Sequence, residues 1–279
     1  QAMDSGSIAA QTGTIAIGAQ ALGALTAGNY NIAIGYQSQD ALTIGDYNVS
    51  LGYSALGTNV DGSSNTAVGH QSLEVFEANA ENEGNNTALG YNSGRFTTTG
   101  ENNTFLGSLA GQGITGTRLT GDDNTAANNV AVGKNALLAI TSGSSNTAVG
   151  AESLDELLTG VNNTAVGKGA LNQLDDSESN NVAVGYLAGG DLDGGNQNTI
   201  IGSNSQATGG TGTNQTVVGY ATTGQANNTV TLGNASVTDV YMAMNVGARF
   251  TIGTGGAVTM PNQPAFLVHP ASTQSNISF

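Results

Sequence analysis

The chain has only two histidines, His70 and His269, and no cysteine, so few side chains could serve as a nucleophile or a general base. His70 directly follows a glycine, in a position that holds tyrosine elsewhere along the chain. The tyrosines in this position are Tyr36, Tyr53, Tyr91, Tyr186 and Tyr220. We therefore interpret His70 as one member of an aromatic column, and we expect no catalytic residues in this chain.

The aromatic column has two interpretations. Its rings could pack on one another between successive repeats, or their faces could contact the apolar faces of sugars. We favour ring packing, and we keep glycan contact by the same six residues as the alternative.

Carboxylates occur in groups within three polar, turn-like segments: Asp122-Asp123, Asp175-Asp176-Glu178 and Asp191-Asp193. Paired carboxylates could hydrolyse glycosides, and carboxylate oxygens could bind calcium. The chain shows neither the spacing of an EF-hand nor the glycine-rich repeat that binds calcium. We interpret these acids as solvated turn residues and expect no enzyme and no cofactor, with calcium as the remaining alternative.

The chain is organised by a repeated sequence motif, or phrase, close to Asn-Thr-Ala-Val-Gly. Its glycines are Gly18, Gly35, Gly52, Gly69, Gly90, Gly107, Gly133, Gly150, Gly167, Gly185, Gly202 and Gly219, with a shortened echo at Gly233. Most steps between them are 17 residues, with one of 18, a last one of 14, and two much longer ones of 21 and 26. Such a period is typical of a solenoid. We predict an all-β, parallel β-roll of about 13 coils and roughly 60 Å, from the usual spacing between strands.

Each phrase alternates with the period of a β-strand. An aliphatic residue precedes the glycine, a small residue comes before that, and Thr, Val or Ile comes one position earlier. We expect the aliphatic residues to face the core and the small residues to face away from it. The small column would then pack one chain against another: Ala33, Ala67, Ala88, Ala131, Ala148, Ala165 and Ala183.

A second apolar pair follows each glycine, as in Ala21-Leu22 and Ala136-Leu137, and predicts a second short strand in each coil. Asparagine recurs four residues before the glycine and predicts a ladder of stacked, hydrogen-bonded amides. The column is Asn31, Asn48, Asn65, Asn86, Asn103, Asn129, Asn146, Asn163, Asn181 and Asn198.

A threonine column could also suit a solenoid that binds ice. Thr66, Thr87 and Thr104 belong to it, but Ile32, Val49 and other aliphatic residues share the position. Because Thr and Val exchange best where a side chain is at least half buried, we consider ice binding unfavoured.

The formal net charge of −15, with only 5 basic residues, gives no basic face for nucleic acid or for an anionic membrane surface. No apolar run is long enough for a membrane-spanning helix. We divide the chain into a lead-in (1–13), the repeat array (14–224), a closing coil with a neck-like hairpin (225–260) and the start of a head or tail (261–279). Loops are expected at 74–84 and 111–128, where the step lengthens.

Over about residues 14–241, the phrase with its Ala-Leu pairs resembles the head repeats of trimeric autotransporter adhesins, and more closely the related repeats of phage tail fibres. The resemblance implies a left-handed roll and a homotrimer. The 17-residue step, longer than in typical adhesin heads, favours the fibre.

The expected function is therefore a structural segment of a phage tail fibre that projects a receptor-binding tip toward the host cell. Its partners would be copies of itself, other virion proteins and a host receptor that presents a glycan, with no nucleic acid and no membrane. The virion is the expected location. A bacterial surface adhesin, extracellular and attached to the cell, is the alternative.

Overall fold

The computed structural model describes residues 12–78, 84–114, 124–238, 240, 251–252 and 258–259. The chain divides into two compact units, residues 1–234 and 235–279. The first unit holds the repeat array, and it reaches ten residues past the boundary at 224 that the sequence suggested, because the closing coil stacks on the coil before it.

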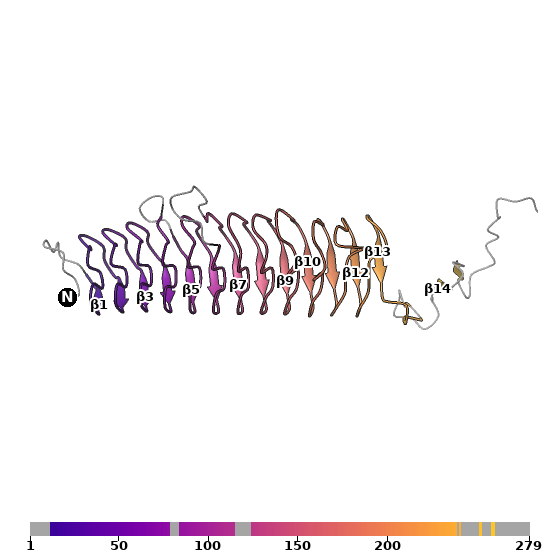
Figure 1. Ribbon diagram of the computed structural model, residues 1–279, viewed down its shortest axis with the longest axis horizontal. Helices are drawn as coiled ribbons and strands as arrows, with labels where there is room; N and C mark the ends of the chain where they lie inside the picture. Colours follow the sequence, from indigo (N-terminus) through magenta and orange to yellow (C-terminus); the bar gives the residue numbers. More distant parts are fainter. Residues whose placement is uncertain are drawn as a thin grey trace, which may run out of the picture. The chain divides into compact units, whose positions relative to one another are not determined.

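The array is one parallel sheet of thirteen three-residue strands, in which each strand pairs with the next one along the chain (Figure 1). This confirms the predicted all-β solenoid. The strands are β1 (Ile15–Ile17), β2 (Ile32–Ile34), β3 (Val49–Leu51), β4 (Thr66–Val68), β5 (Thr87–Leu89), β6 (Thr104–Leu106), β7 (Val130–Val132), β8 (Thr147–Val149), β9 (Thr164–Val166), β10 (Val182–Val184), β11 (Thr199–Ile201), β12 (Thr216–Val218) and β13 (Val230–Leu232).

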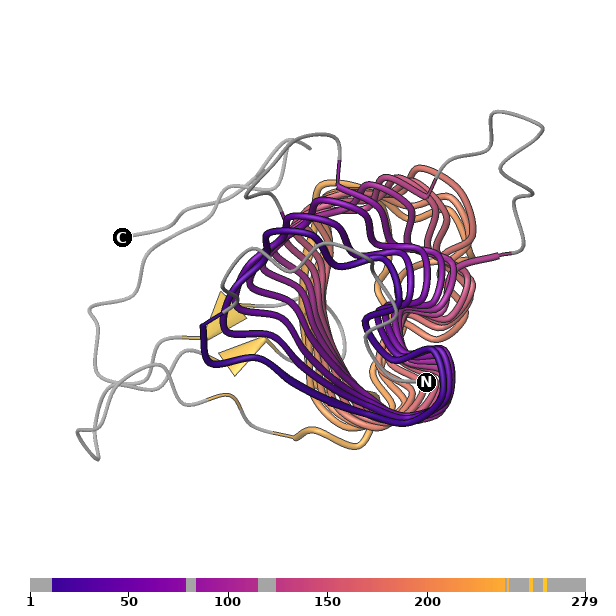
Figure 2. The same cartoon turned by 90° about the vertical axis from the view of Figure 1, so that its left-hand side faces the viewer.

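Every coil repeats the same path, so the coils overlie one another when viewed from the end (Figure 2). Equivalent residues pair throughout, as in Ala148 with Ala165. The two longer steps leave this register intact, since Thr66 pairs with Thr87 and Thr104 pairs with Val130. The extra residues of these steps therefore lie between the strands in sequence, and 79–83 and 115–123, within the loops expected at 74–84 and 111–128, lie outside the described residues.

The middle residue of each strand faces the inside of the coil, which corrects the expected direction of the alanine column. Ala33, Ala67, Ala88, Ala131, Ala148, Ala165 and Ala183 are all fully buried. The residues on either side of them are partly or largely exposed; Ile17, for example, retains 58% of its surface. The alanines cannot be the surface that packs chains together, because they already pack against the opposite wall of their own coil.

That opposite wall is built from turns, and the expected second strand is absent from it in the coils that the structure describes. The leucine of the second apolar pair is buried but adopts a left-handed backbone, with φ of 51° at Leu22, 53° at Leu56 and 50° at Leu154. A non-glycine residue in this region is uncommon and interrupts an extended strand. Backbone bonds still join adjacent coils, as from Leu22 N to Ser38 O at 3.1 Å.

The predicted asparagine ladder is confirmed, and all ten of its members are buried. In the regular coils each amide oxygen accepts two bonds from the next asparagine: Asn129 Oδ1 accepts from Asn146 N at 2.9 Å and from Asn146 Nδ2 at 3.2 Å. Asn146 Nδ2 also donates to Gly160 O at 2.8 Å. The ladder thus satisfies polar groups that would be costly to bury alone.

A second, interrupted ladder, which we did not predict, lies six residues before the glycine in those coils that have Asn, Asp or Ser at this position. There a side-chain oxygen accepts the backbone N–H of the preceding coil, as in Asn29 N to Asp46 Oδ1 at 2.6 Å and Ser179 N to Asn196 Oδ1 at 2.7 Å. The recurrence of Asn, Asp, Ser and Thr at this position was the sequence signal.

Polar residues interrupt the apolar core once near its start. Gln39 takes a leucine position and Ser50 an alanine position, and Gln39 Nε2 donates to Ser50 Oγ at 2.7 Å. The buried apolar residues accordingly form two clusters, one from Ala21 to Leu42 and one from Ala55 onward.

In the second unit, β14 (Thr251–Ile252) and β15 (Val258–Thr259) pair antiparallel, with Thr251 opposite Thr259. This agrees with the hairpin expected there. Residues 253–257 between the two strands, the lead-in up to residue 11, and the tail from 260 lie outside the described residues.

Candidate functional site

The outward face of the sheet carries a continuous aliphatic column, one residue before each glycine. Its exposed members include Ile17 at 58%, Leu89 at 51% and Ile201 at 41%. The column consists of Ile17, Ile34, Leu51, Val68, Leu89, Leu106, Val132, Val149, Val166, Val184, Ile201, Val218 and Leu232. Because in-register pairing stacks these positions directly, they form one stripe along the array.

The threonine column shares this outward face, two residues from the aliphatic column. Thr87 is exposed, and Thr66 and Thr147 are partly buried. Across all thirteen strands the flanking positions hold only Thr, Val, Ile or Leu, and none is charged. The face is therefore uncharged from end to end, on a chain whose net charge is −15.

The predicted aromatic column is stacked ring on ring over four coils, which is the interpretation that we favoured. Ring centroids lie 5.7 Å apart from Tyr36 to Tyr53, 5.0 Å from Tyr53 to His70 and 5.4 Å from His70 to Tyr91. A second stack, which sequence reasoning missed, joins Tyr30 and Tyr47 at 5.2 Å. Both belong to the position just before the asparagine ladder, where the other coils carry polar residues.

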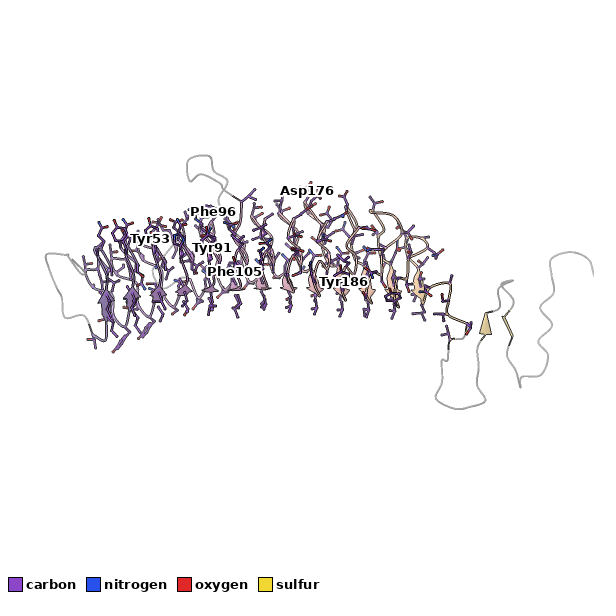
Figure 3. The ribbon with its side chains drawn as sticks, turned by 60° about the horizontal axis from the view of Figure 1, so that its bottom comes forward. Tyr53, Tyr91, Phe96, Phe105, Asp176 and Tyr186 are labelled. Carbon is purple, nitrogen blue, oxygen red and sulfur yellow. The ribbon has the colours of Figure 1, made fainter. Side chains whose placement is uncertain are left out.

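Stacking changes which of the six predicted residues could contact a glycan. Tyr53 and His70 have a ring on each side, so their faces are covered and mainly ring edges reach water. Tyr186 and Tyr220 lie farther along the array; Figure 3 labels Tyr53, Tyr91 and Tyr186. Among the described residues neither Tyr186 nor Tyr220 has a ring partner, and they expose 50% and 69% of their surface.

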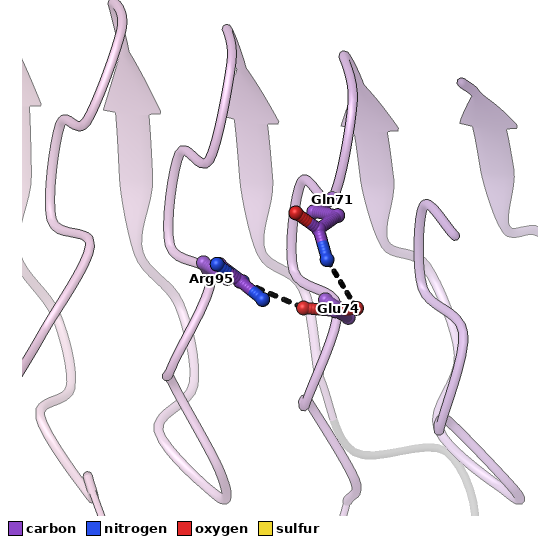
Figure 4. A network of polar contacts seen from close by, with 3 residues as sticks. All are labelled: Gln71, Glu74 and Arg95. Carbon is purple, nitrogen blue, oxygen red and sulfur yellow. Dashed lines mark hydrogen bonds and ion pairs between the residues drawn. The ribbon is translucent and has the colours of Figure 1, made fainter. Parts of the chain in front are cut away.

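A polar network links two coils beside the first long step (Figure 4). Glu74 accepts from Gln71 Nε2 at 2.6 Å through Oε1 and from Arg95 Nε at 2.6 Å through Oε2. The Arg95 guanidinium also lies 4.8 Å from the centre of the Phe96 ring. All three polar groups have partners, so the network ties the coils together and leaves no charge free to act on a substrate.

Two acids on the turn wall have raised pKa values. Burial raises the pKa of Asp155 to about 6, and the nearby charges of Glu156 and Glu152 add to the effect. Burial also raises the pKa of Asp40, which occupies the same position in an earlier coil, five residues after the glycine. Among the described residues, neither Asp155 nor Asp40 contacts a second titratable side chain in a geometry that suits acid–base catalysis.

The other acids singled out from the sequence are spread over turns. Glu178 Oε2 accepts from Asp176 N at 3.0 Å, so it caps its own turn, and Asp191 and Asp193 are exposed. Asp122-Asp123 and His269 lie outside the described residues. In the part of the chain that the structure describes, no group of three or more His, Asp or Glu could hold a metal ion. Nor does that part contain a helix that could span a membrane.

No protein-family model, curated protein or solved structure matches this chain. The candidate surfaces are therefore judged on their own geometry. They are the aliphatic stripe on the sheet and the aromatic column that follows the glycines.

Proposed function

We propose that this chain is a non-enzymatic segment of a homotrimeric fibre, a rigid spacer in a phage tail fibre that carries a receptor-binding tip toward the host cell. The observation that supports this most strongly is the aliphatic stripe on the outward face of the sheet. It replaces the alanine column, which is buried, as the surface through which the chains associate.

The stripe is larger than a soluble monomer normally leaves in water. Exposed apolar patches of more than a few hundred Å² mark interaction surfaces. Completing the burial of a half-exposed Ile, Leu or Val is worth about 1 kcal/mol. Eight of the thirteen stripe residues are exposed and the other five are partly buried, so association would gain at most about 10 kcal/mol per chain before the entropy cost of binding.

Charge also favours a copy of the same chain as the partner. Acidic chains repel one another over most of their surface. The sheet face is free of charged residues, so it is the place where copies can approach without that penalty. The parallel register would let stripes of equal length run side by side. The number three comes from the resemblance of the repeats to those of trimeric fibres.

As a spacer the chain needs stiffness and no catalytic site. Each coil is joined to the next by the sheet, the asparagine ladder and the turn-wall hydrogen bonds. The partners in this proposal are other virion proteins and a host receptor that presents a glycan, and neither nucleic acid nor membrane is involved.

The mass of the full chain in solution tests the proposal. We expect analytical ultracentrifugation to give three chains per particle, and Leu106→Lys to shift the particle toward monomer because it places a charge in the stripe. Ser108→Lys is the matched control, two residues away in the same coil, in a position that holds Lys134 and Lys168 in other coils. A monomeric wild type, or equal effects of the two variants, would contradict the proposal.

A second experiment separates the fibre from a bacterial surface adhesin. Antibodies raised against the chain should label virions in electron micrographs. Labelling of bacterial cell surfaces without virions would favour the adhesin.

A further inference from the structure

We propose that the gap between Tyr186 and Tyr220, above Ser203, is a binding slot for one neutral six-membered sugar ring. The slot is a place in the aromatic column where one ring is missing. It does not rest on the association of chains, and its ligand would be a neutral hexopyranose.

Coil geometry sets the spacing of the slot. Tyr186, Ser203 and Tyr220 each directly follow the glycine of three successive coils. Backbone bonds fix their order: Asn204 N donates to Tyr186 O at 2.8 Å, and Ala221 N donates to Ser203 O at 2.9 Å. Where the same position carries rings in neighbouring coils, centroids lie 5.0 to 5.7 Å apart. Rings two coils apart are therefore about 10 Å apart, room for one further ring.

Tyr186 and Tyr220 differ from the stacked tyrosines because no neighbouring ring that the structure describes covers their faces. In the column from Tyr36 to Tyr91, neighbouring rings cover both faces of Tyr53 and His70 and one face of each end ring. Tyr220 keeps 69% of its surface exposed, and a serine side chain is too short to cover either flanking ring. An aromatic face left without a partner pairs favourably with the C–H face of a sugar.

The floor and rim of the slot are polar, which favours a sugar over an aromatic ligand. Asn204 Nδ2 lies 3.4 Å from Ser203 Oγ, and both groups can bond to hydroxyls. The phenolic hydroxyls of the two tyrosines add donors and acceptors at the rim. Sugar hydroxyls would find partners there, whereas a plain aromatic ring would leave these groups unused.

Charge selects among sugars and against nucleobases. The net charge of −15 repels nucleic acids and acidic sugars. Lys168, in the same position one coil before Tyr186, already lies 3.5 Å from Glu152, so it is partly neutralised. The slot therefore suits uncharged hexoses.

The test is saturation-transfer NMR on the full chain with the methyl glycosides of glucose, galactose and mannose as probes. At least one should receive saturation through its ring protons. Ser203→Tyr should abolish the signal, because it supplies the missing ring in a position where tyrosine is already tolerated at Tyr53. Tyr186→Ala and Tyr220→Ala should each weaken binding by about tenfold or more.

Tyr47→Ala is the matched control, since it removes a ring of the separate Tyr30–Tyr47 stack and leaves no gap between two rings, and it should leave binding unchanged. The proposal is overturned by no binding of any probe to the wild type, by unchanged binding in Ser203→Tyr, or by an equal loss in Tyr47→Ala. Binding of phenol without binding of any glycoside also overturns it. A monomeric wild type would refute the trimeric fibre but not this slot.

Discussion

The two walls of each coil bury their side chains by opposite rules. On the strand wall, a small residue such as Ala148 points inward and its large neighbours point outward. On the turn wall, a large residue such as Leu154 points inward from a left-handed backbone. One wall supplies hydrogen bonds and a flat outer face, and the other supplies the bulk of the core.

This division explains how so thin a coil can be well packed. Alanine lets the strand approach the turn wall, and the leucines fill the space that the alanines leave. The strand's large aliphatic residues are then free to form an outer surface, so the walls together give one chain a core and an interface. The asparagine ladder belongs to the strand wall and, among the residues that the structure describes, is the one polar column buried along nearly the whole array.

The largest expected effect comes from breaking the ladder. Asn146→Leu leaves Asn163 N and Gly160 O without their partners and forces a branched side chain into a packed position. We expect the free energy of unfolding to fall by about 5 kcal/mol, from two unpaired buried groups and overpacking. Urea unfolding followed by circular dichroism at a fixed protein concentration measures it.

Thr147→Val is the control for that variant. Its position holds Val130 and Val182 in other coils, so it should change stability little. Equal midpoints for Asn146→Leu and Thr147→Val would show that the ladder contributes no net stability.

The next largest effect is expected when a large side chain is moved from the strand wall to the turn wall. Phe105 stands in an alanine position of the strand wall, and Gly94 and Gly111 stand in leucine positions of the turn wall beside it. A Cβ at Gly94 would lie 2.8 Å from the Phe105 ring, so the glycines make room for it. The same pairing of a large residue in the alanine position with a glycine in the leucine position occurs at Ile200 and Gly189. A Cβ added to Gly189 would lie 3.1 Å from Ile200 Cδ1.

Phe105→Ala should therefore lower stability by about 3–5 kcal/mol, because it opens a cavity. Gly111→Leu should also destabilise, by about 1–3 kcal/mol through overpacking. The double variant should recover about 1–3 kcal/mol relative to the sum, since leucine then fills the cavity. The backbone permits this, because φ is 55° at Gly111 and 51° at Leu137 in the same position. Strictly additive effects in a double-mutant cycle would refute the exchange.

These compensations show what the sequence could reveal about the fold. The glycine period predicted the coils, the strands and their parallel stacking, because equal steps align equal residues. The asparagine ladder followed from the same register. The direction of the strand's faces did not, since alternation distinguishes two faces without saying which is inside.

A signal for the right face was present. Asn146 and Ala148 are two residues apart, so they share a face of the strand. A ladder that excludes water must be buried, and alanine must be buried with it. The turn wall offered no such signal, because leucine rarely adopts a left-handed backbone and its pattern with alanine resembles that of a strand. The sequence shows Ser203 between two tyrosines of the column, but only the ring spacing in the structure shows that the gap has room for another ring.

The smallest effect concerns titration on the turn wall. Asp155 has a pKa of about 6 in the folded chain, above its ordinary value of 3.8, because burial and the adjacent Glu156 disfavour its ionised form. The folded chain therefore binds more protons than the unfolded one between about pH 4 and 6, and stability falls as the pH rises through this window.

Asp155→Asn should remove that part of the pH dependence, worth less than about 1 kcal/mol because the carboxyl is half exposed. Thermal unfolding of the wild type and of Asp155→Asn from pH 4 to 7 measures it. An unchanged slope in Asp155→Asn would place the titration elsewhere, and Asp40, in the same position of an earlier coil, would be the next residue to test.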